Sequence, residues 1–134
     1  MSESGAVDLS GVWSGNYIYP GSLDPVSFVA EIRHLGDSFS GVVSEPAPAE
    51  TGLGEIDSVI TGTCAGSRVA FTKIYDEPDI FLQPVDYDGT VDSDGNEIVG
   101  EWTITGEYSG GFVMARAKLN RQEETIDDFI EVIR

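Results

Sequence analysis

The stretch Leu9-Ser10-Gly11-Val12-Trp13-Ser14-Gly15-Asn16-Tyr17 (LSGVWSGNY) opens the first segment of the chain that alternates like a β-strand. Trp13, Gly15 and Tyr17 are spaced two residues apart, so they share one face of that strand. Glycine inside a strand weakens it, and its presence between two large side chains indicates bending or close packing. We therefore predict a first strand over about Gly11 to Tyr19.

Seven further segments show the same alternation, separated by clusters of Gly, Pro, Asp and Ser. Most links between them have the length of a hairpin, apart from a proline-rich connection at 46–54 and a second irregular one from 76. Eight antiparallel strands with short links predict an all-β, up-and-down β-barrel, because closing the sheet removes its exposed edges. A β-sandwich is the main alternative. The predicted strands cover about 26–35, 38–45, 56–65, 68–75, 85–91, 98–105 and 111–119.

A second pattern favours the barrel. In several segments a large side chain stands two places before a glycine, which sets a bulky group and a gap side by side on one face. A small barrel needs strongly coiled strands and an interior that alternates large and small residues. The pairs are Trp13/Gly15, Phe39/Gly41, Ile60/Gly62, Tyr87/Gly89, Ile98/Gly100 and Ile104/Gly106.

The hydrophobic period changes at the C-terminus. In RQEETIDDFIEVIR, Ile126, Phe129, Ile130 and Ile133 fall at i, i+3, i+4 and i+7, the apolar stripe of an amphipathic helix. We predict an α-helix over 122–133, packed on the outside of the barrel. The domain prediction is a flexible N-terminal lead over 1–8 and a single barrel domain over 9–134.

The composition restricts the partners of the protein. Its formal net charge of −17 repels nucleic acid and anionic lipid, so we expect neither as a partner. A basic protein partner, a cation or a high-salt cytoplasm are all compatible with that charge, and the oligomeric state is not indicated. The single cysteine, Cys64, precludes an intrachain disulfide. With no signal-like N-terminus and no apolar run approaching about 20 residues, we expect a cytoplasmic protein.

A family resemblance rests on the opening stretch. Gly11-Val12-Trp13 resembles the Gly-x-Trp motif of the lipocalins and their calycin relatives, and the spacing from Leu9 also resembles the first strand of avidin-like barrels. In the calycins this tryptophan closes one end of an eight-stranded barrel against a basic residue of the last strand. The resemblance implies those roles for Trp13 and Arg116, and a helix after the last strand. Val85-Asp86-Tyr87 replaces the Thr-Asp-Tyr common in lipocalins, and no residue set for biotin is present.

The sequence indicates no catalytic residue, no metal ligand and no cofactor. His34, the only histidine, falls on the apolar face of the second strand with no nucleophile motif, so we expect a structural role. We expect Cys64 to be a buried, inert thiol. The acidic run from Asp86 to Glu97 lacks the spacing of an EF-hand, and we interpret it as a solvated turn with Asp86 and Asp88 facing water.

Aromatic residues on the predicted inner faces are the candidate ligand contacts. An eight-stranded barrel either fills its interior or holds one small ligand, and glycines beside the aromatics leave room for one. We therefore predict a non-enzymatic binding or carrier protein for a small, largely apolar molecule. One alternative is an acidic interaction or inhibitor-type module with a filled barrel, which contacts its partner through Ile80-Phe81-Leu82. The other is a small barrel enzyme of the isomerase or cyclase type. The candidate ligand contacts are Tyr17, Phe28, Phe39, Phe71, Tyr75, Tyr87, Trp102 and Phe112.

Overall fold

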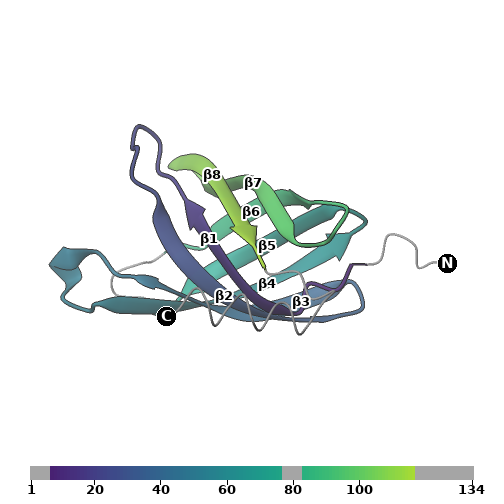
Figure 1. Ribbon diagram of the computed structural model, residues 1–134. Coiled ribbons are helices and arrows are strands. Elements are labelled where there is room, and N and C mark those ends of the chain that lie inside the picture. The colour runs from purple at the N-terminus through teal and green to yellow at the C-terminus, as the bar shows by residue number, and fades with distance from the viewer. Residues whose placement is uncertain (1–6, 77–82, 117–134) are drawn as a thin grey trace, which may run out of the picture.

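Eight β-strands form a closed barrel in the computed structural model of the protein, which describes residues 7–76 and 83–116 (Figure 1). A short 3-10 helix, η1 (Ala49–Thr51), lies in the link between the third and fourth strands. The strands are β1 (Gly11–Tyr17), β2 (Val26–Leu35), β3 (Ser38–Pro46), β4 (Glu55–Ala65), β5 (Arg68–Tyr75), β6 (Val85–Val91), β7 (Glu97–Ile104) and β8 (Tyr108–Ala115).

The topology is a meander that closes on itself. Each strand pairs in antiparallel fashion with the next one in the chain, and β8 returns to pair with β1. The closing register sets Ser14 opposite Ala115 and Tyr17 opposite Phe112. The predicted all-β, up-and-down barrel is therefore confirmed. The sandwich alternative is wrong, because one continuous sheet runs round the molecule.

Several predicted strand ends need correction. β8 begins at Tyr108 and not at Gly111, because Ser109 and Gly110 already pair with Thr103 and Trp102 of β7. The β-structure of β1 ends at Tyr17, and that of β7 at Ile104. The predicted helix over 122–133 and the end of the eighth segment at 117–119 lie outside the described residues.

Close contact between strands explains why glycines recur. A Cβ atom added to Gly62 would collide with the carbonyl oxygen of Ala70, and one added to Gly100 would collide with that of Asp88. These backbones approach closely because the sheet coils tightly into a small barrel. Gly106 is an exception to the predicted pattern: it has a φ of 80° and lies in the turn between β7 and β8.

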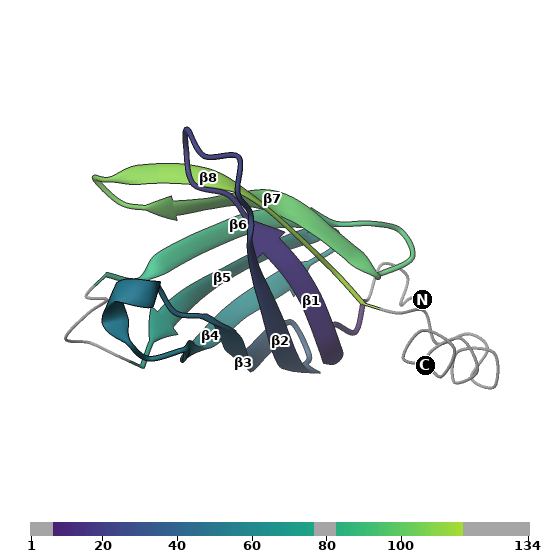
Figure 2. The same cartoon turned by 60° about the vertical axis from the view of Figure 1, so that its left-hand side comes forward.

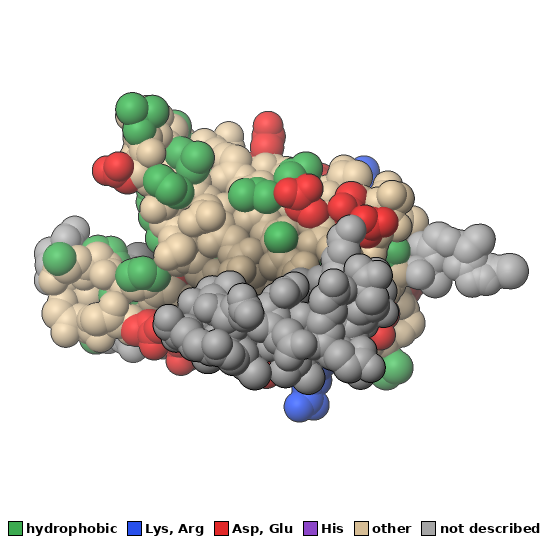
Figure 3. All heavy atoms as spheres, viewed as in Figure 1, with side chains coloured by type: hydrophobic (Ala, Val, Ile, Leu, Met, Phe, Trp, Pro, Cys, Tyr) green, Lys and Arg blue, Asp and Glu red, His purple; other side chains and the backbone are tan. Residues whose placement is uncertain are grey.

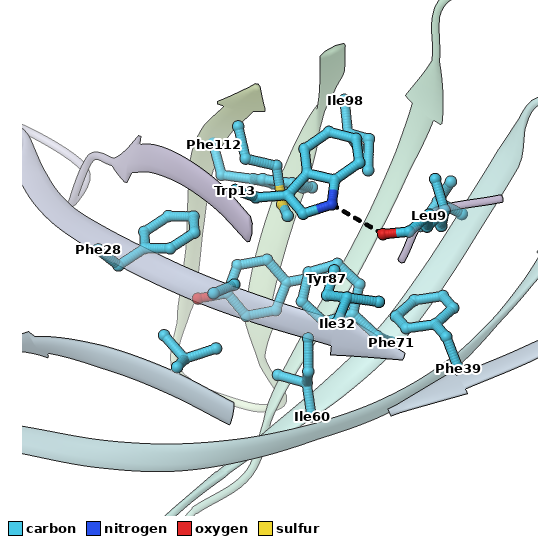
Figure 4. Packing of buried hydrophobic residues seen from close by; sticks show 14 of the residues in the cluster. Leu9, Trp13, Phe28, Ile32, Phe39, Ile60, Phe71, Tyr87, Ile98 and Phe112 are labelled. Carbon is cyan, nitrogen blue, oxygen red and sulfur yellow. Dashed lines mark hydrogen bonds between the residues drawn. The ribbon is translucent and has the colours of Figure 1, made fainter. Parts of the chain in front are cut away.

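Side chains fill the middle of the barrel (Figure 4). The rings of Phe71 and Tyr87 stack with centroids 4.6 Å apart, and Phe112 meets both rings edge-on. Phe39 packs edge-on against Phe71 from the other side. The space left in this layer, beside Ile60, is about 10 Å³. It is about the volume of a single water molecule's probe sphere, so the centre of the barrel has no room for an organic ligand.

Leu9 and Trp13 lie across one end of the barrel. Trp13 and Leu9 are both fully buried, and the Trp13 indole N–H donates a hydrogen bond of 2.9 Å to the Leu9 carbonyl (Figure 4). The Leu9 N–H donates to Nδ1 of His34. The backbone before β1 is therefore tied to the barrel wall from two sides.

Arg116 covers the same end from outside. Its guanidinium carbon lies 4.7 Å from the centre of the Trp13 ring, in cation–π geometry. The guanidinium also donates to the carbonyl oxygens of Asp8, Ser10 and Gly95. The structure thus brings together the two residues that the family resemblance paired, although Arg116 follows β8 and is not within it.

The two ends of the barrel differ in the lengths of their links. Links of two to five residues, such as 36–37, 66–67 and 92–96, lie at the end that Trp13 covers. The longer links, at 18–25 and 47–54, lie at the opposite end together with the short link at 105–107, and the β1–β2 and β3–β4 hairpins splay apart there (Figures 1 and 2). We call this second end the open end.

Candidate binding cavity at the open end

A cavity of about 320 Å³ lies at the open end of the barrel. It is built where β1, β5, β6, β7 and β8 reach past the filled middle layer. Most of its wall is aromatic, and three of the side chains that line it, Tyr19, Gln83 and Glu107, come from links. The lining residues are Tyr17, Tyr19, Tyr75, Gln83, Val85, Tyr87, Trp102, Ile104, Glu107 and Tyr108.

One wall of the cavity is a cluster of rings packed edge to face. The ring planes are nearly perpendicular in each pair formed by Tyr19, Trp102 and Tyr108, and the ring centroids lie between 5.3 and 6.1 Å apart. Tyr17 joins the cluster through edge contacts with Tyr19 and Trp102. The Trp102 indole N–H donates to the Ile18 carbonyl, so this wall presents ring surface with its nitrogen already bonded. Such a wall is pre-organised to receive a flat apolar group.

Beneath the tyrosines lies a buried ion pair. The Lys73 amine on β5 donates a hydrogen bond of 2.9 Å to Glu45 Oε1 on β3. Both side chains are almost fully enclosed, at 2% exposed for Lys73 and 4% for Glu45. The amine also lies over three aromatic rings, 4.8 Å from the centre of Tyr17, 4.7 Å from that of Tyr75 and 5.4 Å from that of Tyr87.

Two tyrosine hydroxyls complete the coordination of the Glu45 carboxylate. The Tyr17 hydroxyl donates to Oε2, and the Tyr75 hydroxyl is 3.3 Å from both carboxylate oxygens. Burial raises the pKa of both tyrosines far above the ordinary value, and the nearby Glu45 charge acts in the same direction. Burial lowers the pKa of Lys73, an effect that Glu45 opposes. The two phenols therefore stay protonated and act as hydrogen-bond donors.

Tyr87 differs from the other two buried tyrosines. Its side chain is 4% exposed, and its hydroxyl points toward the open end, away from Leu9 (Figure 4). Within the described residues this hydroxyl donates no hydrogen bond to the protein, and it reaches the cavity that Tyr87 lines. Burial raises its pKa well above the ordinary value. The floor of the cavity thus offers one protonated donor that a ligand can use.

The structure separates the eight predicted ligand contacts into two groups. Tyr17, Tyr75, Tyr87 and Trp102 line the cavity at the open end. The four phenylalanines, by contrast, do not line it and are packing residues of the barrel interior. These four are Phe28, Phe39, Phe71 and Phe112.

The sequence analysis did not single out Tyr19, Tyr108, Glu45 or Lys73. Alternation in the predicted first strand would have put Tyr19 on the face of Tyr17, although β1 ends at Tyr17, whereas Tyr108 is the first residue of β8 and was assigned to a turn. The sequence did carry a signal for the ion pair. Lys73 alternates with Phe71 and Tyr75, and Glu45 alternates with Val43, so each is a charged residue on an inward face.

The remaining predicted features lie away from the cavity. His34 accepts a hydrogen bond from Leu9 at the other end of the barrel, and Cys64 is buried, with its thiol pKa raised by burial. Asp86 and Asp88 are exposed on β6. In the described ranges no cluster of three or more His, Cys, Asp or Glu side chains is placed to hold a metal ion, and no helix is long and apolar enough to cross a membrane. Ile80-Phe81-Leu82 lies outside those ranges.

Comparison with known proteins finds similar chains among solved structures alone. No protein-family model matches the chain, and no curated protein matches it. Among solved structures, an alanine mutant of the fluorescent protein UnaG is similar at 12% sequence identity and a TM-score of 0.44, over 81% of this chain and 96% of that chain. The barrel assignment therefore stands on this chain's own strand pairing.

Proposed function

We propose that the protein binds a small, largely apolar molecule in the cavity at the open end of the barrel. The observation that carries this proposal is the cavity itself, about 320 Å³ in volume and walled by tyrosines and a tryptophan. Small-molecule sites occupy roughly 300–1,000 Å³ and combine apolar walls with a few polar groups. The ligand is held at the mouth of the barrel, because the middle layer is filled.

Binding explains the polar floor better than catalysis does. Clusters of groups with shifted pKa values are frequent in active sites, and this favours an enzyme as an alternative. However, the Glu45 oxygens already accept bonds from Lys73, Tyr17 and Tyr75, and the Lys73 amine lies beneath the tyrosine rings. A general base needs a lone pair within hydrogen-bond reach of its substrate. This floor instead positions rings and donors.

A fluorescent probe tests the proposal directly. N-phenyl-1-naphthylamine is an uncharged two-ring-system dye that becomes bright in apolar sites, and we expect it to bind at a single saturable site. Replacing Ile104, which lines the cavity, by Trp fills the space that the dye needs. We expect Ile104→Trp to weaken dye binding at least tenfold.

The matched control lies on the same strand. Val99 is half-exposed on the outer face of β7, so Val99→Trp adds the same bulk without entering the cavity. We expect Val99→Trp to bind the dye as the wild-type protein does. Absence of saturable binding, or an equal loss in both variants, would contradict a site in this cavity.

A further inference from the structure

Resting on the proposed function, we infer that the cavity selects uncharged aromatic molecules and discriminates against organic anions, and that the Glu45–Lys73 pair sets this selectivity. The charges that a bound molecule would meet, from the floor of the cavity to its rim, determine the charge class of the ligand.

No cation lines the cavity among the described residues. Of the cations there, Arg33 and Arg68 are on the outer face of the barrel, and Arg116 covers the other end. Lys73 is therefore the described cation nearest to the cavity. The three tyrosines over which its amine lies also line the cavity, so the amine is separated from a ligand by little more than one ring.

The charge of Lys73 is already neutralised. Glu45 Oε1 accepts a hydrogen bond of 2.9 Å from the Lys73 amine, and the two side chains are buried together. Whichever member holds the proton, the pair is neutral as a unit. An anionic ligand group would thus lose its hydration at the cavity floor without gaining an opposite charge, which is strongly unfavourable in a buried site.

The surroundings add to the discrimination. The one charged side chain that lines the cavity within the described ranges is Glu107, an acid. The chain as a whole carries a net charge of −17, and acidic side chains are spread over the face shown in Figure 3, where Lys and Arg are sparse. The donor that a ligand does meet is the neutral Tyr87 hydroxyl, which suits an uncharged acceptor such as a carbonyl oxygen or a ring nitrogen.

Two dyes that differ by one sulfonate test this selectivity. N-phenyl-1-naphthylamine is uncharged, and 8-anilino-1-naphthalenesulfonate is the same molecule with an anionic group. We expect the wild-type protein to bind the uncharged dye at least tenfold more tightly than the anionic one, and to keep that ratio in 1 M salt. Salt screens the field of distant surface charges but has little effect on a buried pair.

Variants locate the origin of the selectivity. Glu45→Gln keeps the shape of the side chain but removes the counter-charge, so at pH 6 we expect the uncompensated Lys73 charge beneath the tyrosine rings to attract the sulfonate. The ratio of the affinity for the uncharged dye to that for the anionic dye should then fall at least tenfold. The double variant Glu45→Gln/Lys73→Met restores a neutral floor and should return the ratio to that of the wild-type protein. The control Glu101→Gln removes a carboxylate from the outer face of β7, away from the cavity, and should change the ratio less than threefold.

Each outcome decides between the two proposals. If the anionic dye binds the wild-type protein as tightly as the uncharged dye, the selectivity inference is overturned while binding in the cavity stands. A ratio that collapses to one in 1 M salt, or that is the same in a folded Glu45→Gln protein, assigns the selectivity to surface charge and overturns the role of the pair. If neither dye binds, the proposed function fails, and the inference fails with it. The wild-type comparison needs no variant, so it remains decisive if Glu45→Gln does not fold.

Discussion

Lys73 and Glu45 are the two charged side chains that the described part of the barrel encloses. Taking two ions out of water costs several kcal/mol each, and a buried pair persists only when the remaining lone pairs and protons are also satisfied. Tyr17 and Tyr75 satisfy the carboxylate, and three ring faces surround the amine. The cavity floor is therefore a network in which each hydroxyl has its own energetic role.

Tyr17→Phe removes a donor to a buried carboxylate but keeps the ring that packs against Lys73. We expect it to lower the free energy of unfolding by about 1.5–3 kcal/mol, the range for hydrogen bonds to charged groups. Tyr87→Phe is the matched control, because the Tyr87 hydroxyl bonds no described residue. It should change stability by less than about 0.5 kcal/mol. Urea unfolding measures both, and equal losses in the two variants would contradict the network.

Trp13 is the second residue whose role is testable alone. It is fully buried, bonded to Leu9 and covered by Arg116. Trp13→Ala should lower the free energy of unfolding by about 3–5 kcal/mol, as expected for removal of a large buried aromatic side chain. Its neighbour Val12 is 58% exposed, so Val12→Ala should cost less than about 0.5 kcal/mol. A Trp13→Ala protein of full thermal stability would refute a closing role for this residue.

At the scale of the strand, alternation predicted most of the fold. The bounds of β2 and β5 are those expected from the sequence, because each runs between clear turn residues. The start of β8 was missed because Tyr108-Ser109-Gly110 reads as a turn. Gly110 is instead a strand residue that Trp102 packs against. Close packing and turn formation both favour glycine, so composition alone does not separate them.

Gly100→Ala tests the close approach of neighbouring strands. The added methyl group would collide with the backbone of Asp88 and Gly89, and neither can move without disturbing β6. We expect a loss of at least about 1–3 kcal/mol, the usual penalty for overpacking. Gly111→Ala on β8 is the control, since its nearest neighbour is an oxygen 3.8 Å away. Thermal unfolding should show a lower melting temperature for Gly100→Ala alone.

For the whole molecule, the sequence indicated the barrel, its tryptophan and four of the ten residues that line the cavity. The Gly-x-Trp resemblance also placed the opening at the end opposite Trp13, but the sequence did not indicate which residues build that end. That depends on which links are long, on Tyr19 lying beyond a strand, and on β3 and β5 bringing Glu45 to Lys73. These two residues are 28 positions apart, and alternation gives the face of each one but not its register against the other. The available clue to this pair was that Glu45 and Lys73 are charged residues at inward-facing strand positions.

Alkaline pH should destabilise the folded protein through the buried tyrosines. Tyr17, Tyr75 and Tyr87 have pKa values raised above 10 by burial, so the folded state keeps protons that the unfolded state loses. Their contribution to stability is complete below pH 10 and is lost as the pH rises above it. The slope approaches about 1.4 kcal/mol per pH unit for each tyrosine. Lys73, whose pKa burial lowers, makes stability rise with pH only up to its ordinary value of 10.5, so above that pH the tyrosines act unopposed.

Urea unfolding between pH 8 and 12, with tyrosinate absorbance followed in parallel, measures this effect. The folded protein should keep a set of tyrosines un-ionised until it unfolds, and a Tyr17→Phe/Tyr87→Phe protein should show a shallower decline. Stability that stays constant to pH 12 would be incompatible with the burial of these hydroxyls.

The most direct test of binding at the open end uses the two tryptophans as reporters. Trp102 lines the cavity and its indole N–H bonds Ile18, whereas Trp13 lies at the other end and bonds Leu9. A ¹H–¹⁵N correlation spectrum contains one indole resonance from each, assigned with a Trp13→Phe variant. On titration with N-phenyl-1-naphthylamine, the Trp102 resonance should shift saturably while that of Trp13 stays in place. A shift of the Trp13 resonance with Trp102 unmoved would place the ligand at the wrong end of the barrel and contradict the account.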